Sequence, residues 1–241
     1  SEISKTNIKT YRPGSNGEDY NRFDGAIHDA VAFWNTEFLS QNYPPLKPLD
    51  PNLVKAMIYV ESEVGYGFGK NNKAYPDVIQ VGNKNDPAIH TLNNDGWIDP
   101  QTGNVSKEYE WRDGREQVLD YKGEARAETP EQSIKWGVRW LYHKAQEIRE
   151  GKRYWRSWER AAEGYNGGGD PNYLKKVYGI YRNGINFQGK KLWSILLLAF
   201  FVLSSSALTI RFWLVQESRL RTGAQPTTQL LMDNSPKTSV L

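Results

Sequence analysis

The chain contains no cysteine and little histidine. Of its 241 residues, none is a cysteine and three are histidines. The absence of cysteine excludes disulfide frameworks, thiolate metal sites and cysteine nucleophiles. Three scattered histidines argue against a histidine-rich metal centre and against a Ser-His-Asp triad. The compartment stays open, because an exported bacterial protein need not contain disulfides.

Metal-binding motifs are also scarce. Residues 91–102, TLNNDGWIDPQT, have the spacing of a calcium-binding loop, but Thr91 and Thr102 occupy the first and last ligand positions. A calcium loop needs acidic ligands at these positions, so a turn rich in Asn, Asp and Gly is the better interpretation. The sequence predicts no metal and no cofactor.

The chain has no large excess of charge of one sign. It holds 31 basic and 28 acidic residues, for a formal net charge of +3. No run of basic residues alternates with aromatic residues, so nucleic acid is not an expected partner. Aromatic residues are abundant, with nine Trp, fourteen Tyr and eight Phe. They either pack in a core or stack on sugar rings in a groove, and composition does not decide between the two.

One segment has no charge at all. From Leu192 to Ile210 there are nineteen uncharged residues, preceded by Lys190 and Lys191 and followed by Arg211. A helix of this length measures roughly 28 Å, close to the hydrocarbon thickness of a bilayer. A core helix seldom needs an apolar surface on all sides. The pattern therefore predicts a transmembrane helix over residues 192–215.

Helical patterns dominate the rest of the chain, and alternating strand patterns are scarce. Apolar residues at helical spacing predict a helix over residues 23–40. Asp50 followed by Pro51 is typical of a helix start, and the predicted helix runs to about Gly65. Residues 66–128 have loop chemistry, with a short helix expected near 113–120. The predicted divisions are an arm and first helix (1–49), a main helical domain (50–186), a linker (187–191), the transmembrane helix (192–215) and a disordered tail (216–241).

The second half of the main domain has three further helix signals. Thr129 and Gln132 form a capping box that opens a helix with an apolar stripe reaching Ile148. A short helix within residues 157–170 is halted by glycines, and another begins at Asp170-Pro171.

Glu61 stands out on the helix that begins after Asp50. On a helical wheel it falls inside the apolar arc formed by residues such as Leu53, Met57 and Val60, whereas Glu63 falls outside. Desolvation on an apolar face raises the pKa of a carboxyl group, as a general acid at neutral pH requires. The alternative is a glutamate whose side chain reaches past the stripe to an arginine or a helix end.

Four short motifs in a fixed order resemble those of the lytic transglycosylase family, which includes soluble lytic transglycosylases and goose-type-lysozyme-like enzymes that cut bacterial peptidoglycan. The resemblance covers roughly residues 50–183. The residues that carry it are Glu61-Ser62, Ile79-Gln80, the set Ile134, Gly137, Trp140 and Leu141, and Tyr165-Asn166-Gly167. The chain departs from the family pattern at Asp77-Val78, where Gly-Leu is usual, and in a longer polar stretch between Val81 and Thr129.

The resemblance implies a mainly α fold: a lysozyme-like helical catalytic domain with a polar loop insertion, to which the transmembrane helix is added. It also implies that Glu61 is the catalytic acid/base, and that Ser62, Gln80, Tyr165 and Asn166 line the catalytic subsite. The implied reaction cleaves the bond between N-acetylmuramic acid and N-acetylglucosamine and leaves a 1,6-anhydro ring. Peptidoglycan is then the partner, and the expected location is a bacterial membrane crossed by the single span 192–215, with the catalytic domain facing the periplasm and cell wall.

Several alternatives stay open. A hydrolytic muramidase of related fold would use Asp77 or Asp86 to orient a water molecule. A non-catalytic peptidoglycan-binding scaffold would keep the fold without the activity. A pore-forming or signalling membrane protein would account for the apolar segment but not for the motifs. Trp97 and Trp111, in the polar stretch, either stack on sugars or hold the loop in place, and Tyr165-Asn166 is also a plausible helix-capping pair.

Overall fold

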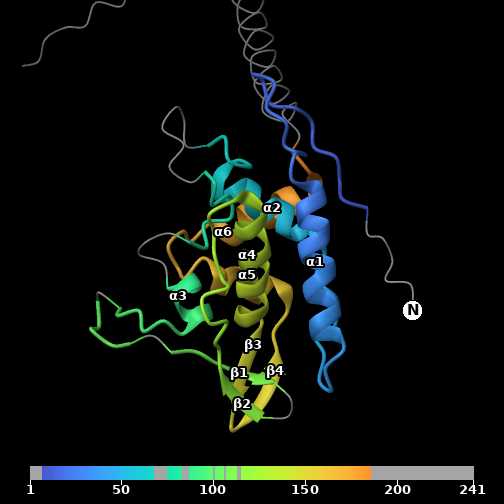
Figure 1. Ribbon diagram of the computed structural model, residues 1–241. Coiled ribbons are helices and arrows are strands. Elements are labelled where there is room, and N and C mark those ends of the chain that lie inside the picture. Colours follow the sequence, from blue (N-terminus) through green and yellow to red (C-terminus); the bar gives the residue numbers. More distant parts are fainter. Residues whose placement is uncertain are drawn as a thin grey trace, which may run out of the picture. The chain divides into compact units, whose positions relative to one another are not determined.

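A computed structural model describes residues 7–67, 75–82, 87–99, 101–105, 107–112 and 115–185. The chain divides into two compact units, Ser1–Asn186 and Phe187–Leu241. The second unit lies outside the described residues, so the predicted linker, transmembrane helix and tail cannot be followed there. All elements named below belong to the first unit (Figure 1).

Helices α1 (Asp24–Leu39) and α2 (Pro51–Ser62) form as the sequence predicts. The expected stripe of α1 is buried: Ile27, Ala30, Val31, Trp34 and Phe38. The Asp50 side chain caps α2 by accepting a hydrogen bond from the Asn52 amide at 2.9 Å. The helix ends earlier than the expected Gly65, because Glu63 and Val64 take left-handed backbone angles (φ 47° and 59°).

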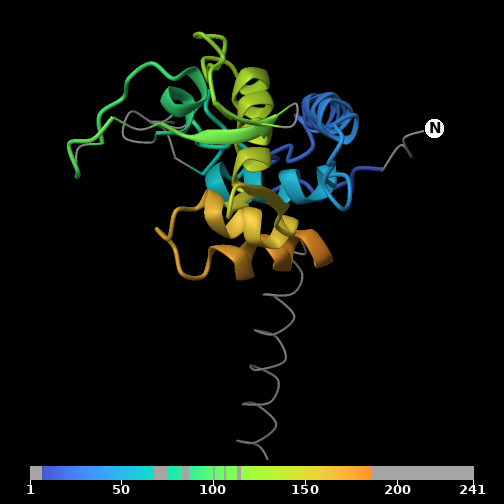
Figure 2. The ribbon, with the colours of Figure 1, turned by 90° about the horizontal axis from the view of Figure 1, so that it is seen from below.

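Helix α4 (Pro130–Lys144) is central to the unit. Figure 2 shows α1 on one side of it, and α5 (Trp158–Tyr165) and α6 (Tyr173–Asn183) on another. Its capping box is a variant: the Thr129 hydroxyl accepts from the Gln132 amide at 3.2 Å, while the Gln132 side chain accepts from the Glu128 amide at 3.1 Å. Ile134, Val138 and Leu141 are fully buried, as the stripe predicts.

Two β-hairpins form in segments for which the sequence pattern predicts helix or loop. Strand β2 (Arg115–Val118) lies where a short helix was expected, and it pairs antiparallel with β1 (Tyr109–Arg112), which lies where loop was expected. Strands β3 (Gln146–Arg149) and β4 (Lys152–Trp155) pair antiparallel where the stripe of α4 was expected to continue to Ile148. A further short helix, α3 (Ala88–Asn93), lies in the stretch expected to be loop.

The predicted fold class is therefore wrong as stated. Within the described ranges the structure combines six helices with two small antiparallel sheets, and is not a helical domain with a loop insertion. The strands escaped detection because each is four residues long and because β1 buries a charged residue, Glu110, where an apolar residue is expected. Hydrophobic alternation cannot reveal a strand of this kind.

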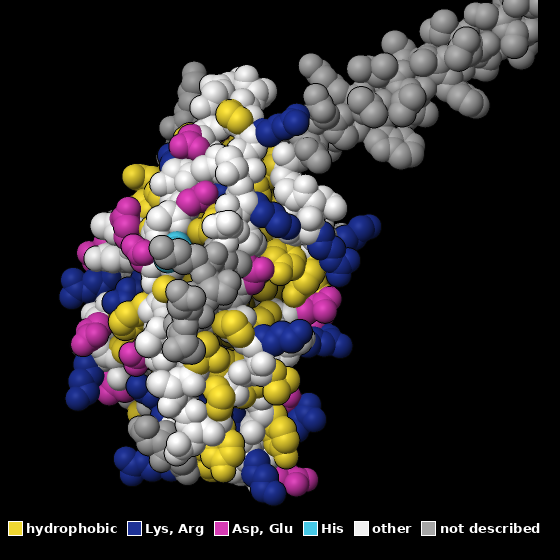
Figure 3. Space-filling model, turned by 90° about the vertical axis from the view of Figure 1, so that its right-hand side faces the viewer, with side chains coloured by type: hydrophobic (Ala, Val, Ile, Leu, Met, Phe, Trp, Pro, Cys, Tyr) yellow, Lys and Arg dark blue, Asp and Glu magenta, His cyan; other side chains and the backbone are white. Residues whose placement is uncertain are grey.

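The membrane prediction also needs correction. Among the residues that the structure describes, no helix has the length and apolar character to cross a membrane. Residues 192–215, which carried that prediction, lie outside the described ranges. The predicted location in a bacterial membrane with a single span is not retained. On the face seen in Figure 3, hydrophobic side chains lie between charged side chains of both signs at the two edges.

Candidate active site

Glu61 lies in the last turn of α2 and its side chain is partly buried, whereas Glu63 is exposed. The wheel prediction of their relative exposure is confirmed. The left-handed turn after Ser62 folds the chain back on the helix end, where the amides of Gly65 and Gly67 each donate to the Ser62 carbonyl oxygen at 2.8 Å. Glu61 is thus held at a helix end of defined geometry, at the edge of the core.

Ser62 joins this helix end to the loop formed by residues 75–82. Its hydroxyl donates to the Val78 carbonyl oxygen at 2.7 Å and accepts from the Gly65 amide at 2.8 Å. The side chain is buried, with 2% of its surface exposed. Ser62 is therefore placed to position the loop next to Glu61, not to line a subsite open to substrate.

Gln80 connects the same loop directly to Glu61. Its side-chain amide donates to the main-chain carbonyl oxygen of Glu61. Gln80 has a left-handed backbone (φ 55°), which turns the chain sharply at the end of the loop. This contact places Gln80 beside Glu61, and its predicted role in lining a catalytic subsite stays a prediction.

Tyr165 contacts the loop from α5. Its hydroxyl donates to the Ile79 carbonyl oxygen at 2.9 Å. Gly137 of α4 lies against the same residue: a Cβ atom added there would stand 2.3 Å from Ile79 Cγ2 and 3.2 Å from the Tyr165 hydroxyl. Glycine is required at this position because α4 and the loop approach so closely.

Asn166 is oriented differently. Its side-chain amide donates to the Asp170 carbonyl oxygen at 3.1 Å, and its own carbonyl oxygen accepts from the Gly169 amide at 3.1 Å. These contacts stabilise the turn after α5, which is the capping role left open by the sequence. The structure thus brings Glu61, Ser62, Gln80 and Tyr165 together around one loop and gives Asn166 a place in the adjoining turn.

Asp77 is engaged within the loop. Its carboxylate accepts hydrogen bonds from the Ser133 hydroxyl at 2.6 Å and from the amides of Val81 and Gly82 at 3.1 and 2.7 Å. Burial raises the pKa of Asp77, and these hydrogen bonds oppose the rise. Ser133 also accepts from the Ile79 amide at 3.2 Å. The carboxylate therefore closes the loop and fastens it to α4.

Tyr173 is the site residue that sequence reasoning missed. It lies at the start of α6 and is buried, with 4% of its surface exposed. Burial raises its pKa well above the ordinary value, and the charge of the nearby Glu61 carboxylate raises it further. This contact lacks the geometry of a regular hydrogen bond, and the Tyr173 hydroxyl makes no such bond within the described ranges. A neutral hydroxyl therefore faces the carboxylate of Glu61.

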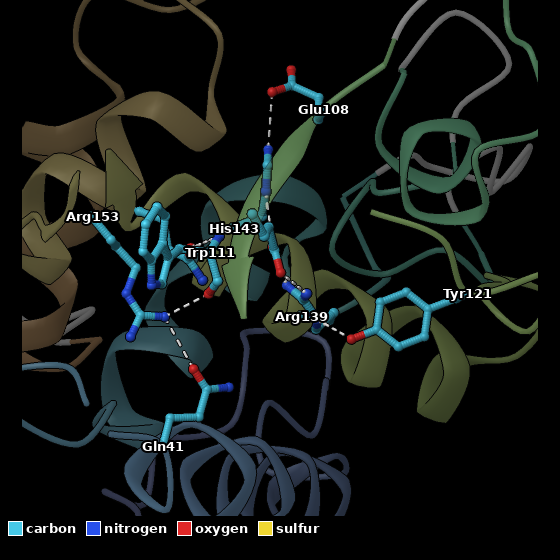
Figure 4. Close-up of polar contacts among 9 residues, drawn as sticks. Gln41, Glu108, Trp111, Tyr121, Arg139, His143 and Arg153 are labelled. Carbon is cyan, nitrogen blue, oxygen red and sulfur yellow. Dashed lines mark hydrogen bonds and ion pairs between the residues drawn. The ribbon is translucent and has the colours of Figure 1, made fainter. Parts of the chain in front are cut away.

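The two tryptophans of the polar stretch have separate surroundings. Trp97 stacks on His90, with ring centroids 6.2 Å apart. Trp111 lies on β1, next to Glu110, whose carboxylate forms a buried ion pair with Arg139 of α4. Figure 4 shows this network. The buried ion pair fixes the strand that carries Trp111, and the choice between sugar stacking and loop anchoring stays a prediction.

Among the described residues, no cluster of three or more His, Cys, Asp or Glu side chains is placed to hold a metal ion. In the segment that resembles a calcium loop, the Asp99 carboxylate accepts from the Gln101 amide at 2.8 Å, as in an ordinary turn.

Comparison of the chain with protein-family models, with curated proteins and with solved structures found no match.

Proposed function

We propose that this protein is a peptidoglycan lytic transglycosylase in which Glu61 is the general acid and base. The observation that carries the proposal is the placement of Glu61. It is a partly buried carboxylate at a helix end, faced by the Tyr173 hydroxyl and joined through its carbonyl oxygen to Gln80. The order of the four motifs, which resembles that of lytic transglycosylases, supports the same assignment.

The reaction needs one group that first gives and then takes a proton. Glu61 would donate its proton to the glycosidic oxygen between N-acetylmuramic acid and N-acetylglucosamine as the bond to C1 breaks. The muramic acid C6 hydroxyl would then attack C1, and its proton would pass to Glu61. The new C1–O6 bond closes a 1,6-anhydro ring, and Glu61 is protonated again with no water consumed.

The surroundings of Glu61 suit this double role. Carboxylates in a partly apolar site retain a proton more readily than exposed ones, which favours general acid catalysis. Tyr173 would act as a positioning residue, because its hydroxyl can donate to the carboxylate after the proton has left. Ser62, Gln80 and Tyr165 would hold the loop against the helix end.

The main rival is a hydrolytic muramidase. Inverting hydrolysis needs a second carboxylate, about 6.5–9.5 Å from the first, to activate water, and retention needs one about 5–5.5 Å away. Asp77 was the nearest sequence candidate, but its oxygens accept from Ser133, Val81 and Gly82. Asp86, the other candidate, lies outside the described residues. The occupied carboxylate of Asp77 favours the transglycosylase over this rival.

The test digests purified peptidoglycan with the full chain and weighs the released muropeptides. We expect 1,6-anhydro ends, which are lighter than reducing ends by one water. Glu61→Gln should lower the rate by about 10²- to 10⁴-fold, the usual contribution of a general acid or base. Glu63→Gln is the matched control, since Glu63 is exposed two residues away, and its activity should stay close to that of the wild type.

Three results would overturn the proposal. Equal activity of the Glu61→Gln variant and the wild type, at matched thermal unfolding, would remove Glu61 from the mechanism. Mainly reducing ends, lost in Asp77→Asn, would establish the muramidase instead. If the folded wild-type protein binds peptidoglycan without cleaving it, the protein is instead the non-catalytic peptidoglycan-binding scaffold.

A further inference from the structure

Two hollows meet beside Trp111, where the chain after α1 passes the hairpins. Their volumes are about 270 and 260 Å³, and they share Tyr43, Trp111 and Arg153. We call the lining of both the Trp111 surface. Its remaining members are Glu37, Ser40, Gln41, Asn42 and Arg112 in the first hollow, and Lys152 and Tyr154 in the second.

Arg153 holds the parts of this surface together. Its guanidinium donates to the Gln41 side chain at 3.0 Å, to the Trp111 carbonyl oxygen at 2.8 Å and to the Tyr43 carbonyl oxygen. Figure 4 shows its bonds to Gln41 and Trp111. The Trp155 indole N–H also donates to the Tyr43 carbonyl oxygen, at 2.8 Å. Three separate segments are therefore fixed relative to one another before any ligand binds.

A buried ion pair fixes the strand that carries Trp111. Glu110 and Arg139 are both fully buried, and the Arg139 Nη1 atom donates to Glu110 Oε1 at 2.8 Å. His143 lies between Glu110, at 2.9 Å, and Glu108, at 3.1 Å. Successive side chains on a strand point to opposite faces, so the buried Glu110 directs its neighbours Tyr109 and Trp111 to the other face. A surface fixed in this way loses little freedom when it binds.

The lining has the mixture of groups that a sugar chain requires. Tyr43 and Tyr154 expose 66% and 49% of their surface, and their rings can stack on the apolar face of a sugar. Gln41 and Asn42 offer amides that donate and accept, which suits hydroxyl and N-acetyl groups. Arg112 and Lys152 add positive charge for the carboxylates that peptidoglycan carries.

Other ligand classes fit less well. A lipid chain would need an uninterrupted apolar lining, which the charged and amide side chains break up. Nucleic acid binding depends on many phosphate contacts with Lys and Arg, and Glu37 opposes them. Both hollows are slightly smaller than ordinary ligand pockets of about 300–1,000 Å³, as expected for single sugar rings on a chain that runs past them.

We propose that the Trp111 surface is a second saccharide-binding site, for chains of N-acetylated hexosamine units, separate from Glu61. The hairpins lie at the end of the unit opposite to α2, which carries Glu61 (Figure 1). A long glycan strand that engages both sites would gain affinity from the second contact. A short oligosaccharide would engage one site at a time. The inference goes beyond the proposed function, since the surface would bind glycan whether or not Glu61 cleaves it.

The test measures binding of the full chain, with Glu61→Gln in every sample so that the glycan stays intact. The probes are purified peptidoglycan sacculi in a sedimentation assay and the N-acetylglucosamine hexamer in a titration. We expect Trp111→Ala to raise the Kd for sacculi about tenfold and Tyr154→Ala about threefold, the usual loss for a stacked aromatic side chain. Tyr109→Ala is the matched control, because Tyr109 is 50% exposed on the same strand as Trp111 but lines neither hollow.

Unchanged Kd values in Trp111→Ala and Tyr154→Ala would overturn the inference, and so would an equal loss in Tyr109→Ala. Tyr154→Ala keeps the test valid if Trp111→Ala unfolds, because the Tyr154 ring is half exposed. The proposed function fails separately: wild-type protein that yields no anhydro product, yet loses binding in Tyr154→Ala, would keep this site and remove the transglycosylase. If the wild type yields anhydro product but Trp111→Ala and Tyr154→Ala leave binding unchanged, the transglycosylase is kept and the second site is removed.

Discussion

Glu61 and Glu63 stand two residues apart, yet the helix end gives them different surroundings. Glu61 still belongs to α2 and lies at the edge of the core, while Glu63 already has a left-handed backbone and points to solvent. Buried side chains can therefore interact with the carboxylate of Glu61, whereas water solvates the carboxylate of Glu63. Tyr173 is one of these buried neighbours, and the proposed function makes its hydroxyl testable.

Tyr173→Phe should slow peptidoglycan cleavage about three- to tenfold, because it removes the hydroxyl that faces the Glu61 carboxylate; a tenfold loss corresponds to about 1.4 kcal/mol. The variant lacks a donor that favours the ionised carboxylate, so Glu61 would stay protonated to higher pH. We expect the alkaline limb of the pH–rate profile to move upward. A purely structural role for Tyr173 would lower the rate without moving the profile. Tyr178→Phe, in the same helix, serves as the control.

At the scale of elements, the approach of α4 to the loop 75–82 decides the geometry of the site. Gly137 allows this approach, and Ser133, one turn earlier, fastens the loop through Asp77 and the Ile79 amide. The motif residues Ile134 and Gly137 thus contribute by packing. Their effect on the site passes through Ile79 and the hydroxyl of Tyr165, which binds the Ile79 carbonyl oxygen.

Gly137→Ala should destabilise the fold by about 1–3 kcal/mol, the usual cost of overpacking a core. The added methyl would displace Ile79 and lower cleavage activity as well. Thermal unfolding and peptidoglycan cleavage measure the two effects. Gly179→Ala in α6 is the control: no atom lies within 4 Å of its added Cβ, so better helix propensity should stabilise the fold by up to about 1 kcal/mol. Equal stability of the Gly137→Ala variant and the wild type would show that α4 and the loop can separate at little cost.

At the scale of the whole unit, charged side chains join the first hairpin to the helical core. Arg139 and Glu110 are buried together, and His143 lies between Glu110 and Glu108, with Lys144 3.9 Å from Glu108. Arg153 of β4 and the Tyr121 hydroxyl also face this group. Burial alone would lower the pKa of His143, but its hydrogen bonds to Glu108 and Glu110 and their charges raise it above the ordinary value.

This raised pKa predicts how stability depends on pH. A histidine whose folded-state pKa lies above its unfolded value, about 6.5, stabilises the fold fully below that pH and loses the contribution as pH rises through the folded-state pKa. Urea midpoints of the wild type and of His143→Gln, measured from pH 5 to pH 9, should therefore differ most at low pH and converge at high pH. A difference that grows with pH would mean that His143 is neutral in the folded protein.

The sequence alone determined the positions of five helices (α1, α2, α4, α5 and α6) and the exposure of the two glutamates. Asp50 and Thr129 cap helices with their own side chains, and the apolar stripes of α1 and α4 repeat at helical spacing. These effects are local, because they depend on residues within a few positions of one another. Sequence patterns can therefore predict them.

The tertiary structure alone decided the hairpins and the neighbours of Glu61. Glu110 becomes a core residue only because Arg139, 29 positions away, neutralises it, and no local pattern reports that pairing. Tyr173 reaches Glu61 because α6 packs against α2, which brings distant parts of the chain together. Burial of a charge and contact between remote helices join residues that are far apart in the sequence. They therefore depend on the fold of the whole chain and not on any local pattern.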